Sequence, residues 1–267
     1  MSSEPVAPFD PSKPNIARAY DFILGGKDNF AADREVASKI LEAYPLTGVL
    51  VRESRSFLIR AVDYVSRQGV TQFIDVGSGL PTSPNTHEVA YEADPDACVV
   101  YVDNDPVVIA HARALLAADG CVAVAPGDVH DPEAILASVR KTGVVDLDKP
   151  VCVILAMLLH FLDPAEAANR TAAFVHAIAP GSYMIMSVGV NNNDPELGAR
   201  FAAAYTAAPL YLHKHDDVAG YFAGLEIVEP GLTEARFWRS PSPPPAESRP
   251  ADIVAGVGRK PLLPSVS

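Results

Sequence analysis

The sequence has 267 residues, 49% of them hydrophobic and 20% charged, which is enough for one medium-sized domain with an accessory segment around a substantial core. Its formal net charge of −12, without a run of Lys or Arg, excludes a general binder of the nucleic-acid backbone. No leader-like start and no apolar stretch of about 18 residues occurs, so we expect a cytoplasmic protein without membrane contact.

The N-terminal quarter predicts a flexible start followed by helices. Residues 1–13 hold three prolines among small polar residues and are expected to be flexible. Apolar residues then recur at helical spacing; Gly25-Gly26 ends the first helix, and Asp28 or Asn29 can cap the second. In the third helix the charged side chains, among them Arg55, are expected mostly on the outer side. Residues 14–69 thus form a predicted helical cap or lid, with helices near 16–24, 29–44 and 47–68.

From residue 70 onward, short apolar segments alternate with helical ones, and residues 70–260 form the predicted core before a tail of 261–267. This alternation is typical of a parallel sheet covered by helices on both faces, with ligands at the carboxyl ends of the strands. Strands are expected near 71–77, 98–103, 121–125, 151–157, 182–189, 224–229 and 252–258. Helices are expected near 84–93, 106–118, 131–140, 165–179 and 195–207.

The stretch from Gln72 to Thr82 is the most informative motif. It is an apolar run that ends in Asp75 and continues into a loop containing Gly77 and Gly79. Gly77 allows a turn that a residue with a Cβ disfavours, and Gly79 allows close approach of a ligand to the backbone. Amide groups at the start of the following helix would then face that ligand. A nucleotide-like cofactor is the leading hypothesis.

Two further strands also end in acids, Asp103 and Asp128. A carboxylate at the tip of the second strand is well placed to accept both hydrogen bonds of a ribose diol, and the third suits an adenine amino group. An NAD(P)-dependent oxidoreductase is disfavoured, because Thr82 replaces the third glycine of a dinucleotide loop and roughly 70 residues precede the first strand. A cofactor-binding regulatory protein without catalytic activity is the other alternative.

Three segments together resemble a bacterial family of S-adenosyl methyltransferases of unassigned substrate, within the class I S-adenosylmethionine-dependent methyltransferases. They are Arg18–Arg34, Arg52–Arg55 and Phe73–Thr82, and the resemblance extends from about Asn15 to Arg259. It implies a Rossmann-like fold with a mostly parallel seven-stranded sheet. It also implies S-adenosylmethionine as the cofactor, but it does not supply a substrate. We expect a small-molecule acceptor, and no metal is implied.

The resemblance assigns the cofactor contacts position by position. Asp75 and the loop from Gly77 to Gly79 would surround the methionine part, with Ala156 and Met157 beneath it. Asp103 would hold the ribose. Asn104, Asp128 and Val129 would lie beside the adenine. The expected cofactor-binding residues are Asp75, Gly77, Ser78, Gly79, Asp103, Asn104, Asp128, Val129, Ala156 and Met157.

Three residues are candidates for catalysis. His160 follows the fourth strand in place of the short polar motif common in these enzymes, and a reference pKa near 6.5 would suit a general base. Packing within the loop is its alternative role. Tyr20 and Lys27 could reach the transferred methyl from the lid, although this segment could equally be a capped helix junction.

Other polar features are expected to be structural. His213 and His215 are interpreted as parts of a polar surface loop rather than a metal site. Cys98, Cys121 and Cys152 are expected to be buried free thiols in core strands. The proline-rich segment 241–250 is expected to be a solvated connector.

Overall fold

The structure, a computed structural model, describes residues 10–116, 121–191, 194–245, 247, 249 and 251–262. The predicted flexible start lies outside the described residues except for 10–13, and the predicted tail lies outside them except for 261 and 262. Within the described ranges, no helix is both long and apolar enough to cross a membrane.

Three helices precede the sheet, as the apolar spacing predicts: α1 (Ile16–Leu24), α2 (Ala31–Ala43) and α3 (Thr47–Arg67). Gly25, with φ of 87°, takes the left-handed conformation that ends α1. The predicted cap of the second helix by Asp28 or Asn29 is wrong. Phe30 occupies the cap position, and the carboxylate of Asp33 in the first turn accepts its N–H group at 2.8 Å.

Strands and helices then alternate. The strands are β1 (Gln72–Val76), β2 (Cys98–Asp103), β3 (Val122–Pro126), β4 (Cys152–Ala156), β5 (Tyr183–Asn191), β6 (Glu226–Ile227), β7 (Thr233–Glu234) and β8 (Ala251–Arg259). The helices are α4 (Thr86–Ala93), α5 (Pro106–Leu116), α6 (Pro132–Thr142), the 3₁₀ turn η1 (Leu159–Phe161), α7 (Pro164–Ala177), α8 (Pro195–Ala204) and α9 (His215–Tyr221). The strand predicted over 224–229 is reduced to β6, and β7 and α9 were not predicted. These elements are too short for a periodic pattern to show.

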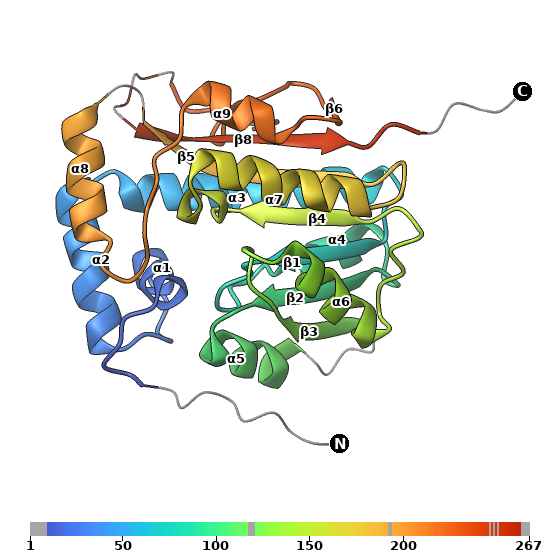
Figure 1. The fold of residues 1–267 in the computed structure, drawn as a ribbon, viewed down its shortest axis with the longest axis horizontal. Coiled ribbons are helices and arrows are strands. Elements are labelled where there is room, and N and C mark those ends of the chain that lie inside the picture. Colours follow the sequence, from blue (N-terminus) through green and yellow to red (C-terminus); the bar gives the residue numbers. More distant parts are fainter. Residues whose placement is uncertain are drawn as a thin grey trace, which may run out of the picture.

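The sheet order is β3-β2-β1-β4-β5-β8-β6, with β7 also paired to β8. Strands β1 to β5 pair in parallel, and β8 runs antiparallel to β5 along its whole length. Figure 1 shows this order from β3 at the bottom to β6 at the top. The predicted mostly parallel, Rossmann-like sheet is confirmed, with one two-residue strand beyond the predicted seven.

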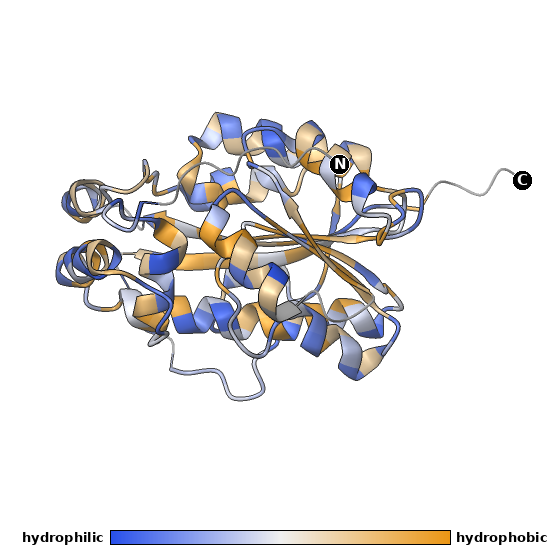
Figure 2. Cartoon of the chain, turned by 90° about the horizontal axis from the view of Figure 1, so that it is seen from below, coloured by the Kyte–Doolittle hydropathy of each residue, from blue (hydrophilic) through white to orange (hydrophobic). Residues whose placement is uncertain are grey.

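Successive side chains of each strand enter two different cores. On β1, Phe73 joins a cluster with residues of α3, α4 and α5, whereas Ile74 joins a cluster with α6, α7 and α9. The same alternation occurs at Ile154 and Leu155 of β4. Figure 2 shows the apolar strands enclosed between two layers of helices. Because α3 shares a core with β1 and β4, the N-terminal helices are packed directly on the sheet.

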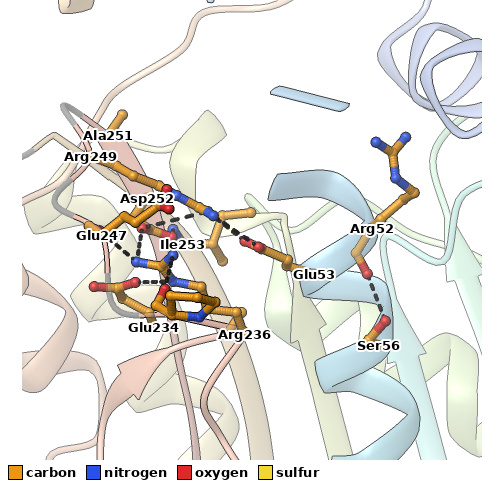
Figure 3. Close-up of polar contacts among 12 residues, drawn as sticks. Arg52, Glu53, Ser56, Glu234, Arg236, Glu247, Arg249, Ala251, Asp252 and Ile253 are labelled. Atoms are coloured by element: carbon orange, nitrogen blue, oxygen red, sulfur yellow. Dashed lines mark hydrogen bonds and ion pairs between the residues drawn. The ribbon is translucent and has the colours of Figure 1, made fainter. Parts of the chain in front are cut away.

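The proline-rich segment is tied to the rest of the protein, in addition to being the solvated connector that was expected. Its described prolines are exposed, but Arg236 donates to the carbonyl of Glu247 at 2.7 Å. Arg249 binds both carboxylate oxygens of Glu53 on α3, at 2.7 and 3.1 Å. Asp252 of β8 lies between the two arginines, 3.9 Å from each (Figure 3). Paired charges therefore fix this segment.

Two other expectations also need correction. His213 is fully buried: its Nε2 lies 3.0 Å from the Leu162 carbonyl and its Nδ1 lies 2.6 Å from the Tyr221 hydroxyl. The unpredicted helix α9 supplies Tyr221 and thereby encloses this ring; His215 alone is exposed. Cys98 and Cys121 are only half-buried, because they lie at the start of β2 and just before β3, whereas Cys152 is buried as expected.

Candidate active site

A cavity of about 420 Å³ lies at the carboxyl ends of the parallel strands. Its wall combines these strand ends with α1 and α3 on one side and residues 201–212 with the start of β8 on another. In Figure 1, β4 points towards the side on which α1, α2 and α8 lie. All ten residues expected to contact the cofactor line this cavity: Asp75, Gly77, Ser78, Gly79, Asp103, Asn104, Asp128, Val129, Ala156 and Met157.

The loop after β1 depends on its two glycines. Gly77 has φ of 69° and Gly79 has φ of 65°, a region that other residues rarely adopt. A Cβ on Gly77 would lie 2.7 Å from the Leu158 side chain, so a larger residue there would require Leu158 to move. A Cβ on Gly79 would meet no atom within 4 Å. The backbone at Gly79 thus borders open space where a ligand can approach it.

Asp103 at the end of β2 is almost fully buried, with 7% exposure. Its Oδ2 accepts the N–H of Gly79 and its Oδ1 accepts the N–H of Asp105, each at 2.9 Å. Burial raises the pKa of Asp103 to about 6, although both backbone hydrogen bonds oppose the shift. Each oxygen retains a lone pair, so the carboxylate can still accept hydrogen bonds from a ligand.

The end of β3 is polar and more open. Asn104 Nδ2 donates to Asp128 Oδ2 at 3.0 Å, and the backbone N–H of His130 donates to Asp128 Oδ1 at 3.0 Å. Burial alone would raise the pKa of Asp128, but these hydrogen bonds and the His130 ring together hold it below the usual value. Asp128 therefore carries its negative charge at neutral pH, next to an amide that it orients.

The ends of β1 and β4 complete the strand side of the cavity. Asp75 accepts a 2.6 Å hydrogen bond from the Thr86 hydroxyl, and burial raises the pKa of Asp75. Met157 has φ of 54°, an uncommon conformation for a residue with a side chain. Its N–H group is held by the backbone and hydroxyl oxygens of Ser187, and Ser187 in turn contacts Ser54 of α3 at 3.0 Å. Backbone strain of this kind often occurs at functional sites.

The three candidate catalytic residues lie in different surroundings. Tyr20 lines the cavity, and burial raises the pKa of its hydroxyl to about 12. His160 also lines it, with 3% exposure, and burial lowers its pKa to about 3 rather than leaving it near 6.5. Nδ1 of His160 has no hydrogen-bond partner among the described residues. Lys27 is exposed and is not part of the cavity wall, because it follows the left-handed turn that ends α1.

Most polar groups next to Gly25-Gly26 are used within the junction of α1 and α2. Asp21 accepts hydrogen bonds from the N–H of Asp28 at 3.0 Å and from Asn29 Nδ2 at 2.8 Å. A Cβ on Gly26 would lie 1.9 Å from Asp21 Oδ1, so a glycine is needed for this contact. The polar residues there close a turn. Of the two candidates from this segment, Tyr20 lines the cavity and Lys27 does not.

The sequence did not indicate several residues of the wall. Arg55 was expected on the outer side of α3 but borders the cavity. Three rings that the sequence did not single out also line it: Phe161, Phe201 and Tyr205. The rings of Phe161 and Tyr205 lie 6.1 Å apart. The Arg52–Arg55 motif could have drawn attention to Arg55, but no local pattern marks the other rings as neighbours.

A family model described as S-adenosyl methyltransferase matches residues 2–261. The chain belongs to this family. Its membership confirms the predicted resemblance, the enzyme class and S-adenosylmethionine as the cofactor of this methyltransferase. No curated protein matches the sequence.

Solved structures agree with the family assignment. A candidate methyltransferase from Thermobifida fusca YX is 40% identical, with a TM-score of 0.88 over 94% of this methyltransferase and 96% of that chain. A DUF574 family protein from Streptomyces avermitilis is 35% identical, with a TM-score of 0.87 over 94% and 99% of the two chains. The N-methyltransferase NodS from Bradyrhizobium japonicum, solved with S-adenosyl-L-homocysteine, is 14% identical with a TM-score of 0.50 over 91% and 99%, a likeness of fold.

Proposed function

We propose that this methyltransferase transfers the methyl group of S-adenosylmethionine to a small, apolar molecule that carries a ring. This proposal rests on one observation: the cavity wall has a polar, acidic part and a separate apolar part. Acidic strand ends and the glycine loop form one part of the wall, and aromatic and aliphatic side chains form the other. The apolar part includes Tyr20, Leu50, Val51, Leu58, Phe161, Phe201, Tyr205, Leu210 and Leu212.

The strand side has the chemistry that this cofactor requires. The buried carboxylate of Asp103 suits the two ribose hydroxyls, since charged acceptors form strong hydrogen bonds. Asn104 and Asp128 suit the polar edge of adenine, with Val129 beside its ring. The open space at Gly79 and the wall at Ala156 and Met157 suit the methionine part.

The other side of the cavity suits an uncharged, flat acceptor. Apolar pockets with a few polar groups are typical of sites for small molecules. Asp252 is the one charged residue at that end of the described wall, and the guanidinium groups of Arg236 and Arg249 lie 3.9 Å from it. The rings of Phe161 and Tyr205 offer stacking surfaces, and His160 and the two tyrosine hydroxyls offer hydrogen bonds.

When bound, S-adenosylmethionine supplies a methyl group on a positively charged sulfur that leaves as a neutral thioether. The protein has to place the acceptor atom in line with that methyl and to exclude water, which can supply much of the rate. His160 is neutral at physiological pH because its pKa is lowered to about 3. We assign it a hydrogen bond that orients the acceptor. Transfer of the acceptor's proton to this ring would be unfavourable, so a role as general base is not assigned to it.

Incubation with methyl-labelled S-adenosylmethionine and a fractionated small-molecule extract tests this function. We expect the label to enter a compound that partitions into an organic solvent. Label found only in protein or nucleic acid would contradict the acceptor class. Cofactor binding without any transfer, across all fractions, would favour the regulatory alternative.

A further inference from the structure

Arg55 is the only lysine or arginine among the described residues of the cavity wall. Four acids line the same cavity: Asp75, Asp103, Asp128 and Asp252. A ligand carboxylate inside the cavity would therefore be repelled by most of the fixed charges. It would find one permanent positive partner, because a guanidinium stays protonated in proteins.

The guanidinium of Arg55 is held at the glycine loop. Nη2 donates to the carbonyls of Thr82 and Pro84, which follow that loop. Nη1 has no hydrogen-bond acceptor among the described residues, and Nε is buried without one. Two carbonyls thus fix the orientation of this half-buried fork and leave donors unused, including the buried Nε, an unfavourable arrangement unless a ligand completes it.

The charge of Arg55 acts on groups that border the predicted methionine end of the cavity. It lowers the pKa of Asp75 and of Tyr20 against the larger upward effect of burial. Asp75 precedes the glycine loop by two residues, and Tyr20 comes from α1. Arg55 thus lies where the chain before the sheet meets the loop after β1.

We infer that Arg55 binds the carboxylate of the cofactor's methionine moiety, and that it makes the site selective for a cofactor that has this carboxylate. The inference rests on the proposed cofactor site. An arginine fork matches a carboxylate with two parallel hydrogen bonds, and the fixed Nη2 would preset its direction. The N-terminal part of the chain would then contribute a direct cofactor contact from α3, in addition to covering the cavity.

A purely structural role is the rival explanation, because Arg55 also links α3 to residues 82–84. Two ligands separate the two roles. S-adenosylmethionine and decarboxylated S-adenosylmethionine differ only in the carboxylate, so a distorted loop would weaken both, whereas a lost carboxylate contact would weaken only the first.

The experiment is calorimetry with both ligands on the full-length wild type, Arg55→Met, Arg55→Lys and Arg52→Met. Arg52 is one turn earlier on α3, exposed and outside the cavity wall; Figure 3 shows its side chain directed away from the paired charges around Glu53. Arg55→Met should weaken S-adenosylmethionine binding at least about tenfold, with decarboxylated ligand binding changed less than about twofold. Arg55→Lys should recover part of the loss, and Arg52→Met should match the wild type.

An equal loss for both ligands, or no loss for either, would overturn the role of Arg55. The failure of the cofactor assignment itself is distinguishable, because the wild type would then bind neither ligand. Thermal unfolding of each variant without ligand checks that Arg55→Met remains folded; if it does not, Arg55→Lys alone must still show the selective loss.

Discussion

The carboxyl group of Asp103 is buried, yet it must be ionised to accept both predicted hydrogen bonds from the ribose of the cofactor. Its pKa is raised to about 6, compared with a usual 3.8. Between these pH values the folded protein binds more protons than the unfolded chain. The contribution of Asp103 to the free energy of unfolding therefore falls as pH rises through about 6. The affinity for the cofactor should change in the opposite direction, because only the ionised form accepts both ribose hydrogen bonds.

We therefore predict that the affinity for S-adenosylmethionine falls as pH drops from 7 to 5, by up to about tenfold. Calorimetry across this range measures the dependence. Asp103→Asn should bind the cofactor weakly at pH 7 and lose most of the pH dependence. If Asp103→Asn kept the wild-type profile, the titrating group would lie elsewhere.

For His160 we expect no contribution to the pH dependence of the methyl-transfer rate. Because burial lowers its pKa to about 3, its ring stays neutral from pH 5 to 8 and contributes no inflection to the methyl-transfer rate. His160→Asn, which keeps a hydrogen-bonding group near Nδ1, should retain most of the activity, whereas His160→Phe should lose about tenfold. A rate that follows a pKa near 6.5 and loses it in both variants would restore the general-base role.

At the scale of elements, the paired charges around Asp252 join α3, β7, β8 and the proline-rich segment. Arg236 contacts Glu234 at 2.5 Å and the Glu247 carbonyl at 2.7 Å, and its side chain is 2% exposed. Glu53 and Arg249 extend the pairing to α3. Removal of Arg236 would leave Glu234 without this partner and the buried Asp252 with Arg249 alone, and breaking a buried pair costs more than the pair itself contributes.

Arg236→Met should therefore lower the free energy of unfolding by about 3–5 kcal/mol in urea denaturation. Arg67→Met is the matched control on the surface. The Arg67–Asp63 pair is exposed, with side chains 63% and 36% accessible, so its loss should cost less than about 1 kcal/mol. Similar losses for both variants would show that the cluster around Asp252 is no better protected from water than a surface pair.

Elements with a strong local pattern could be predicted from the sequence. Asp75, Asp103 and Asp128 end apolar runs, and parallel strands bring such ends to one edge of a sheet, where all three line the cavity. The rest depends on tertiary packing. Phe161 and Tyr205 meet because η1 and the end of α8 approach each other, and no spacing encodes that contact. His213 resembled a surface residue because α9, which buries it, is only seven residues long.

At the scale of the whole molecule, segments that are far apart in the sequence line the same cavity. Asn15, Ile16, Ala17 and Tyr20 form part of its wall, and so do Ala251 to Ile253 of the last strand. The strand ends lie between them in sequence. The first helix and the last strand thus line a site whose predicted cofactor side comes from the middle of the sequence. The division into a cap of 14–69 and a core of 70–260 stays a prediction.

The contribution of α1 can be resolved with two single substitutions. Tyr20→Phe removes a hydroxyl from the cavity wall and keeps the ring, so we expect methyl transfer to fall about tenfold with little change in the thermal midpoint. Lys27→Met should leave cofactor affinity, turnover and midpoint unchanged, because Lys27 is exposed outside the wall. Turnover, cofactor affinity and thermal unfolding, measured on both variants, decide whether α1 contributes to catalysis or only to packing.

Loss of turnover in Lys27→Met would mean that α1 and its junction with α2 move over the cavity during the reaction and carry Lys27 to the acceptor. Full activity in both variants would mean that α1 only packs on the core, as its Ile23 does.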